Sequence, residues 1–201
     1  MNQPNDFSPD INTDDSFIKQ YCKSARYSND SNIDHNNSYI VTNERVTAML
    51  LQNGSVITWE SPFYWWDGDN HGSLIPPEII ALRDITSLSA TNRAFAALRA
   101  NHSVVAWGDE NYGGQLPPEI AQLQDIVNLS STRGAFAALR EDRSVASWGD
   151  LYLGGRMPSE IAKLKDIISL SATQLTFIAI RENGKRVAWG GGDTRAHGDY
   201  D

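Results

Sequence analysis

Short apolar runs and polar turns alternate along most of the chain. Phe95-Ala-Ala-Leu98 is an apolar run, Asn101-His102 is a polar turn, and Ser103-Val-Val-Ala-Trp107 is a second apolar run. Two apolar runs joined by a short turn are typical of a β-hairpin. The segment Asp125-Ile-Val-Asn-Leu-Ser130 then alternates apolar and polar residues, which predicts a half-buried strand. Between these strands, Pro117–Leu123 fits either one helical turn that begins at proline or an extended outer strand.

The pattern recurs with a period of 41 residues. The segment that begins at Ala94 matches, without a gap, the segment that begins at Ala135, and a third copy begins at Thr176. A further copy lies upstream, where an Asn-Gly turn precedes Trp59. Such self-similarity marks a stacked repeat architecture, in which each unit buries its apolar faces against its neighbours. We therefore predict a repeat domain over 38–201, with units at about 38–86, 87–127, 128–168 and 169–201.

A tryptophan ends the second apolar run of each unit, at Trp59, Trp107, Trp148 and Trp189. A tryptophan at a fixed place in every unit predicts core packing with the indole N–H hydrogen-bonded. Counting back by one period from Trp107 leads to Trp66 instead of Trp59, so the first unit carries a seven-residue insertion within ESPFYWW. An arginine also recurs, at Arg99, Arg140 and Arg181. These arginines either line an anion site or bridge to Asp125 or Asp166, and we expect the bridges.

The repeat resembles that of the regulator of chromosome condensation family. The residues that carry the resemblance are Phe-Ala-Ala-Leu-Arg, a turn, Ser-Val-Val-Ala-Trp-Gly, a Gly-Gly pair, Pro…Ile…Leu and a final Asp-Ile…Leu-Ser, over about Tyr39 to Asp193. The repeat is also similar to the short alanine-rich variant found in bacterial multi-repeat proteins. The resemblance implies an all-β fold, a propeller-like array of about four short blades, in a family that closes propellers of about seven.

The best-known member of that family exchanges guanine nucleotide on a small GTPase and binds chromatin. The loops after Trp-Gly are short here, which argues against an exchange wedge, and the chain is acidic, which argues against chromatin. Stacked repeats also expose apolar faces at their two ends. Three arrangements relieve that exposure: closure of four blades, assembly of two or more chains into a ring, or an open array capped by another segment. We expect an incomplete ring relieved by self-association, that is, a homo-oligomer.

The amino-acid composition excludes some classes of binding partner. The net charge is -8 and the pI is about 4.9, which excludes an extended basic surface for nucleic acid or for an anionic membrane. Residues 1–37 are rich in Asn, Asp and Ser, and we expect them to form a disordered polar tail. Cys22 is the single cysteine, so no intrachain disulfide forms. We see no cleavable signal or transmembrane segment, which leaves the cytoplasm or export by a route without a signal.

The insertion supplies the candidate partner-binding residues. Four aromatic residues stand in a row outside the repeat pattern and are followed by polar residues that form hydrogen bonds: Phe63, Tyr64, Trp65, Trp66, Asp67, Asp69 and His71. Aromatic residues dominate interface hot spots, and they also stack on sugar rings. The alternative is that they cover the exposed edge of the first blade. The spacing from Asp67 to Glu78 also fits a calcium loop, but a histidine at its fifth position and the Pro76-Pro77 pair argue against one, so we predict no metal.

Catalysis has little support. The histidines, His35, His71, His102 and His197, fall at unrelated phases of the repeat, and no phosphate-binding, dinucleotide-binding or nucleophile motif occurs. We therefore predict a non-enzymatic protein-binding β-propeller scaffold without a cofactor, whose partner is another protein. Two alternatives stay open: a lectin-like carbohydrate-binding module, and a guanine-nucleotide exchange effector that acts on a small GTPase.

Overall fold

The structure is a computed structural model that describes residues 40–60, 71–192 and 195–198. The tail 1–37 and the insertion residues Phe63–Asp69 lie outside the described residues. Among the described residues, no helix has the length and apolar character needed to cross a membrane.

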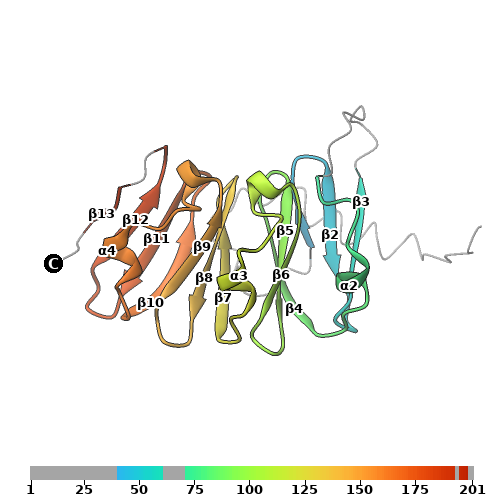
Figure 1. The fold of residues 1–201 in the computed structure, drawn as a ribbon, viewed down its shortest axis with the longest axis horizontal. Helices are drawn as coiled ribbons and strands as arrows, with labels where there is room; N and C mark the ends of the chain where they lie inside the picture. The colour runs from blue at the N-terminus through green and yellow to red at the C-terminus, as the bar shows by residue number, and fades with distance from the viewer. Residues whose placement is uncertain (1–39, 61–70, 193–194, 199–201) are drawn as a thin grey trace, which may run out of the picture. The chain divides into compact units, whose positions relative to one another are not determined.

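Four antiparallel sheets follow one another in chain order (Figure 1). Sheet 1 contains β1 (Ile40–Thr42), β2 (Val46–Leu50) and β3 (Val56–Glu60); sheet 2 contains β4 (Ile85–Ala90), β5 (Ala94–Arg99) and β6 (Val104–Gly108); sheet 3 contains β7 (Ile126–Ser131), β8 (Ala135–Arg140) and β9 (Val145–Gly149); sheet 4 contains β10 (Ile167–Ala172), β11 (Thr176–Arg181), β12 (Arg186–Gly190) and β13 (His197–Gly198). Each sheet keeps its strands in sequence order, so every pair is a hairpin or a short return. The all-β propeller-like array predicted from the repeats is confirmed.

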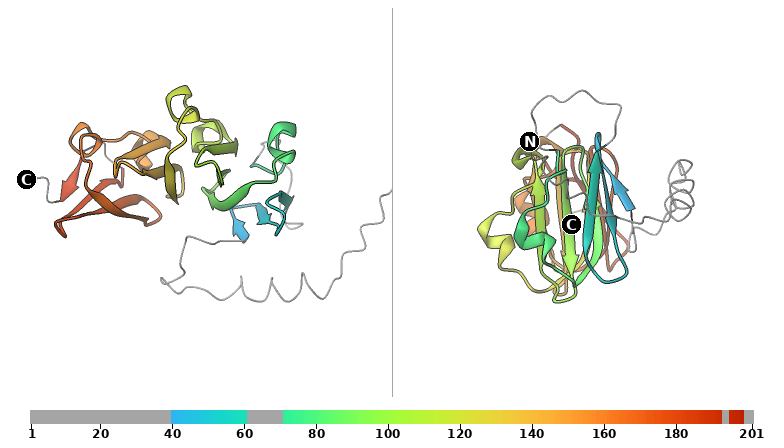
Figure 2. Two further views of the ribbon diagram at one scale, coloured as in Figure 1. Left: turned by 90° about the horizontal axis from the view of Figure 1, so that it is seen from below. Right: turned by 90° about the vertical axis from the view of Figure 1, so that its right-hand side faces the viewer.

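The segment that leads from each sheet to the next contains a short helix. These are α2 (Pro77–Ile80), α3 (Pro118–Ala121) and α4 (Ser159–Ala162), and the 3-10 turns η2 (Glu110–Tyr112) and η3 (Leu151–Leu153) precede α3 and α4. Figure 2 shows that the helices lie along the edge of the sheets opposite the first strands β1, β4, β7 and β10. The segment that fitted either a helix or an outer strand is thus a helix, because proline at its start supplies a helical φ and lacks only an N–H that a first turn leaves unpaired. Each turn buries one isoleucine: Ile79, Ile120 or Ile161.

Both faces of the middle strands are buried, which explains the unbroken apolar run AFAAL in the sequence. One face of each sheet, which we name the alanine face, packs against the following sheet. In sheet 3 it comprises Ala135, Ala137, Leu139 and Val145. The opposite face, which we name the tryptophan face, packs against the preceding sheet, and in sheet 3 it comprises Leu129, Phe136, Ala138 and Trp148.

The tryptophan face has the same internal geometry in sheets 2, 3 and 4. Phenylalanine and tryptophan stand opposite each other in register and stack with ring centroids 5.2–5.3 Å apart, in the pairs Phe95–Trp107, Phe136–Trp148 and Phe177–Trp189. Each indole N–H donates a 3.0 Å hydrogen bond to a glycine carbonyl in the loop of the preceding sheet, at Gly72, Gly113 or Gly154. The same glycine faces the phenylalanine ring so closely that a Cβ on Gly113 would lie 2.7 Å from Phe136. Glycine is therefore required where the loop meets the ring.

Backbone hydrogen bonds also join consecutive sheets at two levels. At the turns between first and second strands, the N–H groups of Glu44, Asn92 and Arg133 donate to Asn92, Arg133 and Gln174 carbonyls at 2.8–3.1 Å. At the hairpin tips, the N–H groups of Ile85, Ile126 and Ile167 donate to carbonyls of Gly54, His102 and Arg143 at 3.0–3.1 Å. These two ladders fix the spacing of the sheets independently of their side chains.

Three core clusters join sheets 1 and 2, 2 and 3, and 3 and 4 in the described part of the chain. No cluster there joins sheet 4 to sheet 1, so the array is an incomplete ring. Trp59 differs from the expectation of a buried tryptophan. Its register opposite Thr47 matches that of Trp107 opposite Phe95, but its exposed fraction is 36%, because no preceding sheet covers it in the described residues.

Candidate functional site

Each recurring arginine binds the aspartate that directly precedes the first strand of its own sheet. Arg140 Nε and Nη2 donate to the two carboxylate oxygens of Asp125 at 3.0 and 2.7 Å. Arg99 pairs in the same way with Asp84, and Arg181 with Asp166. The hydrogen bond to Asp125 raises the pKa of Arg140 above its ordinary value. Because each guanidinium already binds a carboxylate, this row of arginines secures the first strand to the second and is not a ready anion site.

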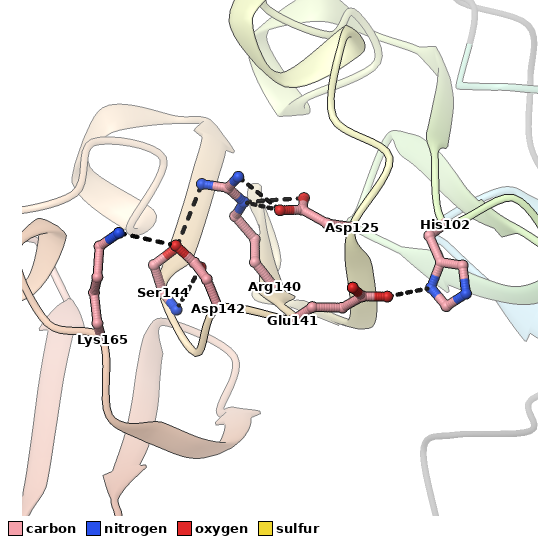
Figure 3. A network of polar contacts seen from close by, with 7 residues as sticks. All are labelled: His102, Asp125, Arg140, Glu141, Asp142, Ser144 and Lys165. Carbon is pink, nitrogen blue, oxygen red and sulfur yellow. Dashed lines mark hydrogen bonds and ion pairs between the residues drawn. The ribbon is translucent and has the colours of Figure 1, made fainter.

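The hairpin tips carry a second set of paired charges (Figure 3). Asp142 accepts hydrogen bonds from the Ser144 hydroxyl and N–H and from Lys165 Nζ at 3.1 Å. These bonds, chiefly the one from the Ser144 hydroxyl, lower the pKa of Asp142 to about 2. His102 Nδ1 lies 3.6 Å from Glu141 Oε1, which carries the contacts across to the neighbouring unit. At these tips, the contact between His102 and Glu141 thus joins two neighbouring hairpins.

A pocket of about 240 Å³ lies along the first strands of the four sheets. Two of its hydroxyls bond within the protein: Ser89 Oγ shares a 2.9 Å hydrogen bond with Ser131 Oγ, which donates to the Ala90 carbonyl at 2.8 Å. No charged side chain lines it. The described residues also hold no group of three His, Cys, Asp or Glu side chains placed to bind a metal. The pocket therefore offers a mixture of hydroxyl and apolar contacts, with no charged side chain to act as an acid or base.

A difference between two equivalent loops singles out a better candidate. The loop after β6 reads Asp109-Glu-Asn-Tyr-Gly-Gly114 and the loop after β9 reads Asp150-Leu-Tyr-Leu-Gly-Gly155. Both form a 3-10 turn in which the aspartate Oδ1 accepts the N–H two residues on, at 2.9 and 2.8 Å. Both end at a glycine with positive φ, 88° at Gly113 and 100° at Gly154. The backbone is the same, so the side chains are what distinguish the loops.

The second of these loops displays two apolar side chains to solvent. Leu151 is 55% exposed and Tyr152 is 62% exposed, whereas the equivalent positions hold exposed Glu110 and Asn111. The third side chain of the turn, Leu153, points inward and is buried. We call Leu151 and Tyr152 the Leu-Tyr patch. Two neighbouring apolar side chains at such exposure, where the sister loop is polar, make this loop the candidate contact site.

The scaffold holds the patch firmly. The Thr132 hydroxyl donates to the Leu153 carbonyl at 2.9 Å, and the Gly192 N–H donates to the Tyr152 carbonyl at 2.9 Å. The Asp150 carboxylate caps the turn from inside. A side chain on such a rigid base loses little additional entropy when it binds.

The residues predicted for partner binding are placed as follows. Phe63, Tyr64, Trp65, Trp66, Asp67 and Asp69 lie outside the described residues. His71 is 3% exposed, and its carbonyl accepts a 2.6 Å hydrogen bond from Asn43 Nδ2. The sequence analysis missed Leu151 and Tyr152, although aligning the two loops residue by residue would have found them.

The chain matches no protein-family model and no curated protein sequence. Its structure is similar to Prp20p from Saccharomyces cerevisiae, with a TM-score of 0.54 and 19% identity over 75% of this chain and 42% of Prp20p. It is also similar to yeast RCC1 (Prp20) in a complex with Kap60, with a TM-score of 0.54 and 14% identity over 82% of this chain and 46% of that one. Human WBSCR16 matches with a TM-score of 0.55 and 12% identity, over 84% of this chain and 52% of WBSCR16.

The chain has an RCC1-type β-propeller fold. The blades of this RCC1-type array are the four sheets described above, and the array spans about half the length of the propeller chains that it matches. Identities of 12–19% show the fold alone. The activity of an RCC1-type array has to be argued from its own surface.

Proposed function

We propose that this chain is a non-enzymatic protein-binding scaffold and that the Leu-Tyr patch contacts the partner. The observation that carries the proposal is the exchange of Glu110 and Asn111 for exposed Leu151 and Tyr152 on an otherwise identical turn. Tyrosine supplies a large, rigid contact area with a polar tip, which is why it is enriched at interfaces. Loops on a rigid β scaffold are the usual place for such contacts.

The similar structures support a binding role at the level of the fold. Prp20p was solved together with a study of its binding to Gsp1p and histones, and yeast RCC1 was solved with Kap60 bound. All three named partners are proteins. The acidic net charge of the present chain, -8, makes a contact with nucleic-acid phosphates through basic residues a poor fit.

The aromatic insertion Phe63–Trp66 supplies a second contact in this proposal. It follows β3, and the Leu-Tyr patch follows β9, so both belong to the segment that leaves the third strand of a unit. Contacts by two such loops would let one partner span several units. Asp67 and Asp69 then provide hydrogen-bond acceptors beside the aromatic side chains.

A photo-crosslinking experiment tests the patch. A benzophenone amino acid replaces Tyr152 in one protein and Asn111 in a matched control, so that the same probe sits on the same turn in two units. We expect a defined adduct with a cellular protein at position 152 and none at position 111. Unlabelled wild-type chain should compete for that adduct.

The deciding competitor is a double variant, Leu151→Glu with Tyr152→Asn, which gives the loop after β9 the two exposed polar residues of the loop after β6. Its turn should fold normally, because Glu110 and Asn111 occupy the same positions in the sister loop. We expect it to compete poorly. Equal competition by this variant, a sugar-specific signal on a glycan array, or faster release of GDP from small GTPases would contradict the proposal.

A further inference from the structure

The two end sheets of the described array expose the two kinds of face that meet at every internal seam. Every internal seam joins an alanine face to a tryptophan face, and the described chain ends with one of each. The N-terminal end face is the tryptophan face of sheet 1 and contains Ile40, Thr47, Met49, Ile57 and Trp59, as the strand register places them. The C-terminal end face is the alanine face of sheet 4 and contains Thr176, Ile178, Ile180, Arg186 and Ala188.

Both end faces keep most of their apolar character but lack cover from any other described residue. Ile57 is 45% exposed and Trp59 is 36% exposed, whereas Phe95 and Trp107 on the equivalent face of sheet 2 are 0% and 2% exposed. Ile178 and Ile180 are half-buried where the equivalent Ala96 is fully buried. Open sheet faces of this kind invite another β unit.

We propose that a second copy of this chain covers both end faces, so that two arrays close head to tail into one ring. The contact pairs the C-terminal end face of each copy with the N-terminal end face of the other. A twofold rotation makes both seams at once, and the assembly then has no free end. The occupant is argued from the chain itself, which builds the same type of seam three times internally.

A matched pair of substitutions distinguishes this seam from the internal seams. Internally, a loop glycine meets a phenylalanine ring, and a Cβ on Gly72, Gly113 or Gly154 would lie 2.5–2.7 Å from that ring. One period after Gly154, the loop after β12 has Arg195, which carries a Cβ. The N-terminal end face has Thr47 in place of the phenylalanine, as its pairing with Trp59 shows. Arg195 would clash with any phenylalanine of the repeat, but the smaller Thr47 leaves the space that it needs.

The same docking continues the hydrogen bonds that run through the array. Trp59 keeps the indole that, in later units, donates to the carbonyl of the preceding loop, and the partner's loop at Arg195 supplies that carbonyl. At the turns, the ladder begins at the Glu44 carbonyl and ends at the Gln174 N–H. Between two copies, the Gln174 N–H of one copy would donate to the Glu44 carbonyl of the other and continue this ladder.

Length agrees with a ring of two copies. The chain matches 42% of Prp20p, 46% of yeast RCC1 and 52% of WBSCR16. Two arrays therefore supply about the length of one complete propeller chain. A single array does not close in the described residues, since no core cluster joins sheet 4 to sheet 1.

Light scattering on a size-exclusion column measures the mass of the full chain over a wide concentration range. We expect a species of twice the chain mass of 22.3 kDa that dissociates only on dilution. A monomer at every concentration would overturn the proposal, because it would mean that the end faces are covered from within the chain or stay bare. A mass that grows without limit would overturn closure, since a head-to-tail contact that does not close forms a filament.

Two variants test the Arg195–Thr47 match. Thr47→Phe places the repeat's own residue on sheet 1, where three other sheets carry it, and should abolish the dimer while circular dichroism stays unchanged. Adding Arg195→Gly should restore the dimer, because the seam then has the internal glycine–phenylalanine form. A Thr47→Phe protein that dimerises like the wild type would overturn the assigned seam.

Cysteine crosslinking reports the direction of docking. In a Cys22→Ser background, one protein carries Glu44→Cys and another carries Gln174→Cys. We expect a disulfide-linked dimer when the two proteins are mixed, and none from either protein alone. Crosslinks within a single-variant sample would show a face-to-face contact and would overturn the head-to-tail ring.

Discussion

The indole of Trp148 donates a 3.0 Å hydrogen bond to the carbonyl of Gly113, and this bond crosses from one blade to the loop of the blade before it. The donor is 2% exposed and the acceptor is buried beside the Phe136 ring. The bond recurs at Trp107 and Trp189, each time with a glycine carbonyl. The tryptophan thus makes both a stacking contact and a directional hydrogen bond, and together these restrict the distance and the rotation between neighbouring blades.

Removing the indole donor should destabilise the chain. Trp148→Phe leaves the Gly113 carbonyl buried without its partner, and we expect a loss of about 1–3 kcal/mol in the free energy of unfolding, on top of the smaller ring. Urea denaturation measures the loss. Trp59→Phe at low protein concentration is the control and should cost far less, since Trp59 is 36% exposed. Equal losses would mean that the hydrogen bond contributes little.

Gly113→Ala should be more costly than Gly184→Ala. Both residues have positive φ, 88° and 80°, so both substitutions carry a backbone cost of about 1 kcal/mol. Only Gly113 faces a ring: its Cβ would lie 2.7 Å from Phe136, whereas a Cβ on Gly184 meets nothing within 4 Å. Overpacking adds about 1–3 kcal/mol at Gly113. Matching unfolding midpoints for the two variants would refute the steric part of the argument.

The Asp125–Arg140 pair should matter more than the pair at the hairpin tip. Asp125 accepts hydrogen bonds from Arg140 through both carboxylate oxygens, and both side chains are more than two-thirds buried. We expect Asp125→Ala to lower the free energy of unfolding by about 1–3 kcal/mol. Glu141→Ala removes only an exposed contact to His102 and should change it by less than about 0.5 kcal/mol. Thermal melts at one pH would show the contrast.

Asp142 gives a pH dependence of known sign. Its folded pKa is about 2, below the ordinary value of 3.8, chiefly because the Ser144 hydroxyl donates to its carboxylate. The stabilisation is therefore complete above about pH 4 and is lost as the pH falls toward 2. The wild type should exceed Asp142→Asn in urea midpoint at pH 7, and the difference should shrink between pH 4 and pH 2. Ser144→Ala should weaken this pH dependence, and a constant difference at all pH values would contradict it.

Most of the fold was predictable from the 41-residue period of the sequence. A gapless 41-residue recurrence shows which segments are equivalent. Once the hairpin with Phe95 and Trp107 is recognised, the positions of the three other hairpins follow from it. The buried isoleucine of each helical turn was harder to predict. The choice between helix and outer strand at Pro118 depends on what packs against Ile120, which is a tertiary property.

The site was harder to predict than the fold, for a physical reason. Within a repeat, an exposed residue can change without disturbing any seam, so the pattern that reveals the core says nothing about Tyr152. Trp59 shows that the burial of a core position is also not determined by the repeat pattern alone. It has the position and register of a core tryptophan, yet its burial depends on a neighbour that the described chain does not provide. Sequence phase predicts where a side chain points, but it does not predict what lies opposite.

The two backbone ladders between sheets have a consequence for how the molecule comes apart. Each unit is tied only to the units before and after it, so opening one seam leaves the others intact. In a single array, amide protons in sheets 2 and 3 should exchange with solvent more slowly than those in sheets 1 and 4, because each end sheet has a neighbour on one side only. Joining the ends into a ring would give the two end sheets a neighbour on both sides. All four sheets should then exchange at similar rates.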